Sequence, residues 1–158
     1  IDKPEHRLVA ALQLDAKTRV SETTLSRGDQ LRGVGVDRLT GREVGFLSVE
    51  DGKGGKGEVL PARLETYRAL ESYLAENGGR LHVTDQQAYR EDVRQACDKS
   101  NQAYNGSHGF RWSGACERLI ALREAGVGYA EALQTVSREM LHERISITLH
   151  YTRDIPPW

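Results

Sequence analysis

Residues 137–153, SREMLHERISITLHYTR, decide the fold of this chain more than any other stretch. The stretch begins inside an apolar helical pattern that runs from Tyr129 to about residue 141, and it then places His142 and Tyr151 nine residues apart. Between these two side chains, residues 145–151 (ISITLHY) fit a strand and a helix equally well by pattern. The elements on the N-terminal side are needed to interpret the stretch.

Working outward, apolar spacing predicts further helices over residues 110–124, 62–76 and 4–14, and one over about 85–103 that Thr84 or Asp85 caps. The mixed stretch 20–31 is expected to continue as helix, and the GVG at residues 33–35 is interpreted as a turn. Residues 43–49 and 58–61 are short β-prone runs joined by the glycine-rich, basic loop 52–57, which predicts a hairpin. The expected fold class is therefore α+β, mostly α, with a small β-sheet or hairpin.

Length and composition fit one packed domain over residues 1–158. A chain of 158 residues buries a sizeable core without a metal or disulfide scaffold, so Cys97 and Cys116 are expected to be reduced thiols. No apolar run reaches the roughly 18 residues of a membrane span, and the first residues lack a signal-peptide pattern, so a cytoplasmic location is expected. The sequence has no GxxxxGK[ST] loop and no ligand-like His/Cys spacing, and its carboxylates are expected to face solvent, so we expect neither cofactor nor metal.

Four local patterns that follow one another along the chain carry side chains of catalytic types. They are Arg19 before Ser21 and Glu22, Lys53 in the glycine-rich loop, His108-x-x-Arg111 near the start of a helix, and His142 ahead of Tyr151. Taken singly, each has an ordinary explanation, such as a surface ion pair for Arg19, a helix cap for His108 or a half-buried aromatic for Tyr151. Their joint order calls for a functional interpretation.

In this order the patterns resemble the catalytic domain of the tyrosine recombinases, the phage-integrase family, and the resemblance spans residues 5–153. It implies the DNA breaking-rejoining catalytic fold, with the family's N-terminal core-binding domain absent from residues 1–158. It also implies a site-specific DNA recombinase or integrase of a phage or mobile element. Such an enzyme cuts and rejoins DNA through a covalent 3′-phosphotyrosine intermediate.

The chemistry of phosphodiester cleavage agrees with the roles that the resemblance implies. Tyr151 is the expected nucleophile, and the guanidinium groups of Arg19 and Arg111 suit the charge that develops on the non-bridging phosphate oxygens. A phenol has a pKa near 10, so Tyr151 needs a base or local positive charge to attack at neutral pH. His108 is the candidate base, because imidazole titrates in the right range.

The remaining candidates serve the leaving group and the DNA. Lys53 is the expected general acid that protonates the departing 5′ oxygen, and Lys56 in the same loop is the other candidate for this role. His142 is expected to bind a phosphate oxygen or to help place Tyr151. Lys56 and Arg144 are expected to contact DNA.

The resemblance implies double-stranded DNA as the partner, with a homo-tetramer on DNA and a monomer when isolated. The 22 Lys and Arg against 23 Asp and Glu give a net charge of -1, so any DNA-facing surface must be a local concentration of basic residues. Two alternatives stay open at this point. One is a type IB topoisomerase-like enzyme with the same nucleophile, and the other is a non-catalytic DNA-binding accessory domain of the same fold.

The chain departs from the family pattern at two positions beside the predicted site. The family usually has Gly-Leu before the first arginine, where this chain has Lys17-Thr18, and it commonly has Gly before the second histidine, where this chain has Leu141. Glycine at such positions usually sets a turn that other residues enter less readily. The two departures therefore bear on the backbone turns that would place Arg19 and His142 in the site.

Overall fold

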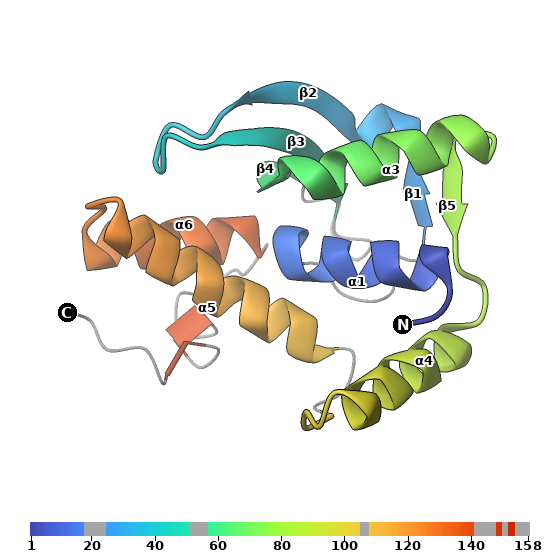
Figure 1. Cartoon of the computed structure of the whole chain (residues 1–158). Coiled ribbons are helices and arrows are strands. Elements are labelled where there is room, and N and C mark those ends of the chain that lie inside the picture. Colours follow the sequence, from blue (N-terminus) through green and yellow to red (C-terminus); the bar gives the residue numbers. More distant parts are fainter. Residues whose placement is uncertain (18–24, 51–56, 105–107, 141–147, 150–151, 154–158) are drawn as a thin grey trace.

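The computed structural model describes residues 1–17, 25–50, 57–104, 108–140, 148–149 and 152–153. The helices within these ranges are α1 (Pro4–Ala16), α3 (Leu64–Glu76), α4 (Gln86–Lys99), α5 (His108–Glu124) and α6 (Tyr129–Glu139), with a short 3-10 helix at Gly28–Gln30. The strands are β1 (Leu25–Arg27), β2 (Leu31–Val36), β3 (Glu43–Glu50), β4 (Gly57–Arg63) and β5 (Arg80–His82). The expected α+β class with a predominance of helix is confirmed (Figure 1).

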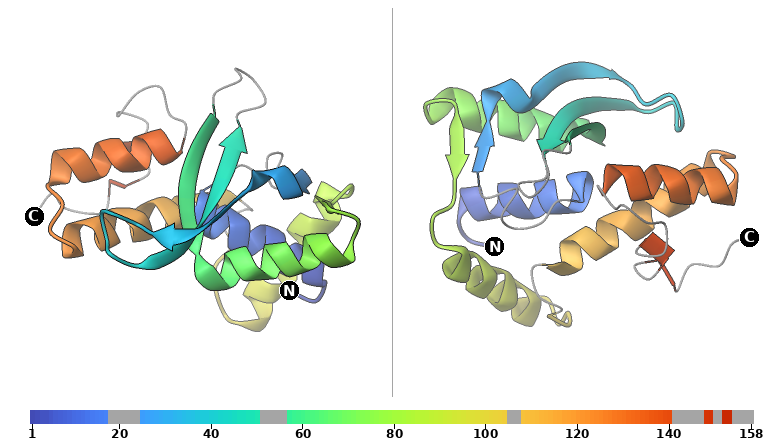
Figure 2. Two further views of the ribbon diagram at one scale, coloured as in Figure 1. Left: turned by 90° about the horizontal axis from the view of Figure 1, so that it is seen from above. Right: turned by 180° about the vertical axis from the view of Figure 1, so that it is seen from behind.

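Helix α1 lies at the centre of the molecule. It contacts α3, α5 and β4, and both Figure 1 and Figure 2 place α3 and the strands on one side of it and α5 on the other. Pro4 begins the helix, where its missing N–H has no helical partner to lose, and Glu5 adds a carboxylate to the first turn. Because α1 packs on several sides, its buried residues include polar Gln13, which accepts a hydrogen bond from Tyr89 Oη at 2.6 Å.

Strands β2, β3 and β4 form an antiparallel sheet in that order, and α3 packs against it. The contact is close because Gly45 on β3 has no side chain: a Cβ there would lie 2.1 Å from the ring of Tyr67 on α3. The hydroxyl of Tyr67 accepts a hydrogen bond from the backbone N–H of Gly33 at 3.0 Å. One tyrosine thus fixes α3 against two strands of the sheet.

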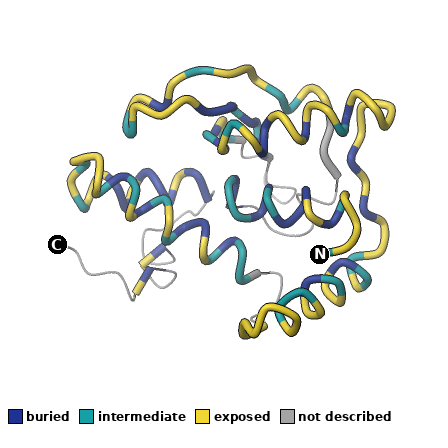
Figure 3. Tube along the Cα trace, in the orientation of Figure 1, coloured by how far each residue is buried: buried dark blue, intermediate teal, exposed yellow. Residues whose placement is uncertain are grey.

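Two larger hydrophobic clusters divide the interior. The first joins buried residues of α1, α3, β3, β4, β5 and α4, and the second joins α5 and α6 through Ala115, Leu119, Leu122, Ala132, Val136 and Met140. The buried segments of Figure 3 follow these inward-facing sides. Helices α1 and α5 connect the two clusters across Gly114, where a Cβ would lie 2.0 Å from the carbonyl oxygen of Leu14.

Two secondary-structure predictions are wrong, and both fall on strands. The described part of the stretch 20–31, predicted as helix, contains β1, the 3-10 helix and the start of β2; residues 20–24 lie outside the described ranges. The GVG at 33–35, predicted as a turn, lies inside β2, where Gly33 has φ 95° beside a register shift. Leu25 pairs with His82 in β5, and so distant a partner leaves no periodic trace in the local sequence.

The helix predictions hold with small shifts of their ends. Helix α4 is capped by Asp85, whose carboxylate accepts a hydrogen bond from the N–H of Ala88 at 2.9 Å, and it ends at Lys99, before the predicted residue 103. The hairpin prediction is also confirmed, because β3 and β4 pair as far as Glu50 and Gly57 on either side of the loop that contains Lys53. None of the described helices has the length and apolarity needed to cross a lipid bilayer.

We predict that Gly114→Ala destabilises the protein by about 1–3 kcal/mol or more, because the added methyl group overlaps the carbonyl of Leu14 and forces α1 and α5 apart. Urea denaturation followed by circular dichroism measures the change. The matched control is Gly28→Ala, whose Cβ would meet no atom within 4 Å. Equal stability of the two variants would contradict the close helix packing.

Candidate active site around Arg111

Arg111 lies in the first turn of α5 and is 2% exposed. Its Nη1 donates a hydrogen bond to the carbonyl oxygen of Lys17 at 2.6 Å, and its Nη2 donates one to the carbonyl oxygen of Met140 at 3.0 Å. Lys17 is the C-cap of α1, and Met140 is the C-cap of α6. A single guanidinium group therefore ties together the C-terminal ends of two helices that are far apart in the sequence.

Both helix ends lead into segments that carry predicted site residues. Arg19 follows Lys17 by two residues, and His142 follows Met140 by two residues. Arg19 and His142 themselves lie outside the described residues. Each nevertheless follows, by two residues, a residue whose carbonyl accepts a hydrogen bond from Arg111. Two residues of chain span at most about 7 Å between Cα atoms.

The segment around Tyr151 has described neighbours on either side. Thr148 and Thr152 are buried, and Thr152 donates through both its N–H and its Oγ1 to the carbonyl oxygen of Thr148, at 3.0 and 2.9 Å. This i to i+4 pattern is helical, which resolves the strand-or-helix ambiguity in favour of helix at residues 148–149. Tyr151 itself lies outside the described residues.

Arg153 connects this segment to α5. Its guanidinium carbon lies 4.6 Å from the ring centroid of Trp112, a distance typical of a cation–π contact. Trp112 follows Arg111 directly, and Arg153 follows Tyr151 by two residues. Lys17, Met140 and Arg153, which lie two residues from Arg19, His142 and Tyr151 respectively, therefore contact Arg111 or its neighbour Trp112.

The other predicted site residues stand as follows. His108 is the first residue of α5, as the His-x-x-Arg pattern predicts, but its side chain lies outside the described part of the structure. Lys53, Lys56 and Arg144 also lie outside the described residues. The structure thus brings Arg111 to the junction of the candidate segments and leaves the assembly of the whole set as a prediction.

A buried ion network, which the sequence analysis missed, lies beside Arg111. Glu139 accepts hydrogen bonds from Nε and Nη2 of Arg118, both at 3.0 Å, and its Oε1 lies 3.1 Å from Nζ of Lys17. Arg118 Nη1 also donates to Asp37 Oδ2 at 2.6 Å. The network connects α1, α5, α6 and the turn between β2 and β3.

The expectation that the carboxylates face solvent is wrong for Asp37 and Glu139, which are 6% and 4% exposed. A signal for their burial exists in α5, because Arg118 shares a helical stripe with the buried Ala115 and Leu122. A cation on an apolar stripe implies a buried anionic partner. The sequence alone does not say which carboxylate fills that place.

The network keeps its carboxylates ionised. Burial raises the pKa of Glu139, but the cations of Lys17 and Arg118 outweigh it and hold that pKa below its usual range. The pKa of Asp37 is likewise raised by burial and lowered further by Arg118, with a net decrease. Among the described residues, no group of three His, Cys, Asp or Glu side chains is placed to hold a metal ion, and Cys97 and Cys116 form no disulfide.

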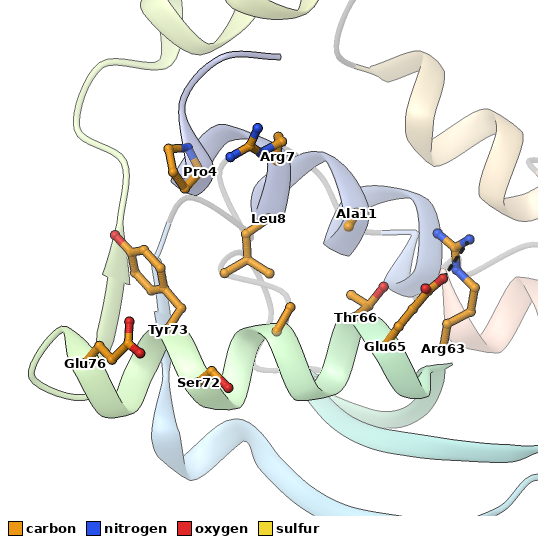
Figure 4. Close-up of a pocket in the computed structure, with 11 residues that line it drawn as sticks. Pro4, Arg7, Leu8, Ala11, Arg63, Glu65, Thr66, Ser72, Tyr73 and Glu76 are labelled. Atoms are coloured by element: carbon orange, nitrogen blue, oxygen red, sulfur yellow. Dashed lines mark ion pairs between the residues drawn. The ribbon is translucent and has the colours of Figure 1, made fainter.

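A groove of about 490 Å³ lies elsewhere, between α1 and α3 (Figure 4). Leu8 and Tyr73 provide apolar parts of its wall, and at one end Arg63 lies 3.6 Å from Glu65. Arg111 is not among the described residues that line this groove. The groove and the Arg111 junction are therefore separate features.

Comparison with solved structures gives the fold. The XerH site-specific recombinase, in a post-cleavage complex with a palindromic difH substrate, superposes with a TM-score of 0.69 at 15% sequence identity, over 96% of this chain and 42% of that chain. This chain has the fold of a tyrosine recombinase catalytic domain. A XerH pre-cleavage complex with difH gives a TM-score of 0.67 at 16% identity, over 94% and 43% of the two chains. The XerA recombinase gives 0.64 at 18% identity, over 96% and 59%.

The chain thus spans about half the length of the recombinases whose structures it resembles. No family model matches the sequence, and no curated protein matches it. The recombinase likeness therefore comes from the three-dimensional arrangement and from the short motifs.

We predict that Glu139→Gln lowers the free energy of unfolding by about 3–5 kcal/mol near pH 7, because it leaves the buried cation of Lys17 without a counter-charge and removes one of the two carboxylates that bind Arg118. Since the folded pKa of Glu139 is lowered, its ionised form stabilises the fold fully above its unfolded pKa, and this contribution is lost as the pH falls through the folded pKa. The difference between wild type and variant should therefore shrink in acid.

Urea denaturation at neutral pH and at a series of acidic pH values measures this effect. The control is Glu71→Gln, which removes an exposed ion pair with Arg68 and should change stability by less than about 1 kcal/mol. A constant difference between wild type and Glu139→Gln over the whole series would contradict the assignment of an ionised Glu139.

Proposed function

We propose that the chain catalyses site-specific DNA strand exchange of the tyrosine recombinase type, with Tyr151 as the nucleophile. The observation that supports this most is the junction at Arg111. Its two carbonyl bonds hold the ends of α1 and α6, two residues ahead of Arg19 and His142, and the adjacent Trp112 binds Arg153, two residues beyond Tyr151. Described residues two positions from Arg19, His142 and Tyr151 thus contact Arg111 or Trp112, which supports three of the four sequence motifs acting together.

In the proposed reaction the phenol oxygen of Tyr151 attacks a DNA phosphorus atom, and the bond from phosphorus to the 5′ oxygen breaks. His108 takes the phenol proton, and Lys53 gives a proton to the departing 5′ oxygen. Arg19 and Arg111 stabilise the charge on the non-bridging oxygens. The product is a 3′-phosphotyrosine with a free 5′ hydroxyl, and attack by a 5′ hydroxyl of a second strand reverses the sequence.

Arg111 would combine two duties in this mechanism. A guanidinium group has five N–H donors, and the bonds to the carbonyls of Lys17 and Met140 use two of them. Its planar group is therefore held in a fixed orientation before any phosphate arrives. Such preorganisation is what electrostatic stabilisation of a transition state requires.

His142, Lys56 and Arg144 would act on the bound DNA. We propose that His142 binds a phosphate oxygen or helps to place Tyr151, and that Lys56 and Arg144 contact the backbone. The β3–β4 hairpin carries the segment that contains Lys53 and Lys56. Its two strands are anchored to α3, so the loop starts from a rigid base.

Double-stranded DNA is the proposed partner, in line with the complexes of XerH with its difH substrate. We propose a homo-tetramer on DNA and a monomer in its absence, with a core-binding domain that is separate from residues 1–158. The proposed setting is the cytoplasm of a cell that carries a phage or mobile element.

Covalent trapping tests the nucleophile. We predict that the chain, incubated with a pool of nicked duplexes of randomised central sequence, forms an adduct that survives SDS gels, because loss of the short nicked fragment prevents rejoining. Tyr151→Phe should abolish the adduct, since the ring without its hydroxyl has no nucleophile. The matched control is Tyr104→Phe, which changes a 37% exposed tyrosine and should leave the yield unchanged.

Absence of any adduct at saturating DNA would reject the enzyme and favour a non-catalytic DNA-binding domain. An adduct accompanied by relaxation of supercoils, without joining of two duplexes, would favour a topoisomerase-like activity.

We predict that Arg111→Lys lowers the rate constant of adduct formation by about 100-fold or more, because an ammonium lacks the planar fork that holds both carbonyls and supports a phosphate. Single-turnover trapping at saturating DNA measures this rate constant. The matched control is Arg123→Lys on the same helix, because Arg123 Nη1 donates to the carbonyl of Val127 at 2.9 Å, at the opposite end of α5. Equal loss in both variants would indicate a general effect on α5.

A further inference from the structure

We propose that Lys17 and Glu139 are positioning residues, whose buried ion pair fixes the two turns from which the segments of Arg19 and His142 leave α1 and α6. This inference rests on the proposed function, because it concerns the placement of residues that the proposed reaction uses. According to this inference, the proposed reaction also requires a side-chain pair that does not contact the substrate.

Each member of the ion pair between Lys17 and Glu139 also binds a further partner. Nζ of Lys17 lies 3.1 Å from Oε1 of Glu139 and donates a hydrogen bond to the carbonyl oxygen of Asp15 at 3.2 Å. Both side chains are almost fully buried, at 1% and 4% exposure. Arg118 donates one hydrogen bond to each oxygen of the Glu139 carboxylate, in a bidentate arrangement. Burial and these bonds therefore restrain both side chains.

The backbone of Lys17 shows what the pair holds. Its φ of 56° and ψ of 34° are left-handed, a conformation that side chains other than those of Asn and Asp rarely adopt. Glycine would adopt this conformation without steric cost. In this chain a buried lysine occupies it, and the ammonium bond to Glu139 favours the turn that the lysine backbone alone disfavours.

A second tie connects the same two turns. Arg111 donates to the carbonyl of Lys17 and to the carbonyl of Met140, the residue after Glu139. The side-chain pair and the two carbonyl bonds therefore join the end of α1 to the end of α6 independently. Two different ties between two turns restrict rotation as well as separation, so the segments that follow are expected to keep one relative orientation.

A purely structural role is the competing explanation, because buried ion pairs often contribute little net stability and simply satisfy each other. The variant Lys17→Gly distinguishes a positioning role from a purely structural role of the ion pair. It relieves the left-handed strain and leaves Glu139 paired with Arg118, but it also empties the space of a fully buried side chain, so we expect the Tm to fall. The adduct rate constant and the hydrogen exchange of both turns, compared with a variant that also loses stability, therefore distinguish the two explanations.

The test measures adduct formation, DNA binding and amide hydrogen exchange in the wild-type chain and in Lys17→Gly, with the same randomised nicked duplexes. We expect the adduct rate constant to fall by up to about 100-fold with unchanged DNA affinity, because misplacement of a reacting group by about 1 Å has effects of that size. Exchange should become faster in both peptides 13–24 and 137–147. Lys17→Arg, which keeps a cation, should recover part of the rate.

Asp92→Asn is the control for loss of a buried pair. Asp92 Oδ2 lies 2.9 Å from Nδ1 of buried His6 at the opposite end of α1, so the substitution should lower the Tm and leave the adduct rate constant unchanged. The proposal is overturned if Lys17→Gly reacts at the wild-type rate, or if exchange rises only in peptide 13–24. If Lys17→Gly does not fold, Lys17→Met and Glu139→Gln take its place under the same criteria.

Failure of the proposed function gives a different result. A wild-type chain that forms no adduct rejects the recombinase activity, while the exchange measurement still decides whether the ion pair couples the two turns.

Discussion

The guanidinium group of Arg111 donates to the carbonyls of Lys17 and Met140, and the arrangement of the candidate site depends on these two bonds. The last carbonyls of a helix have no partner within the helix, and buried carbonyls left unsatisfied are costly. Here one side chain from a third helix satisfies two of them. The arginine is thereby immobilised, and the ends of α1 and α6 are brought together in the same step.

The buried charged side chains of the molecule compensate one another and are separate from those at its surface. The net charge of -1 conceals a buried network in which Lys17, Arg118, Asp37 and Glu139 compensate one another. Residues committed to that network do not contribute to an exposed electrostatic surface. A proposed DNA contact therefore has to come from other basic side chains, and Lys56 and Arg144 remain the proposed ones.

Much of the helical framework could be predicted from the sequence, because apolar residues in α3, α5 and α6 recur at a spacing that local neighbours determine. The strand β1 was missed because its partner lies more than fifty residues away, at His82. The His108-x-x-Arg111 pattern was expected near the start of a helix, and α5 begins at His108. The carbonyl bonds of Arg111 were not predictable, because they depend on backbone atoms that every residue possesses, whereas the family glycine at the position of Lys17 indicated a turn there. Arg19, Lys53, His142 and Tyr151 stay predictions.

The division of the interior into two hydrophobic clusters has a consequence for how the molecule would lose its function. Lys17 belongs to a helix of the first cluster, whereas Arg111 and Met140 belong to the helices of the second. Undocking of the α5–α6 pair as a unit would preserve nearly all helical hydrogen bonds while separating the carbonyls from one another. Far-ultraviolet ellipticity would then register a nearly intact protein, and inactivation on storage or mild heating would precede any visible melting of secondary structure.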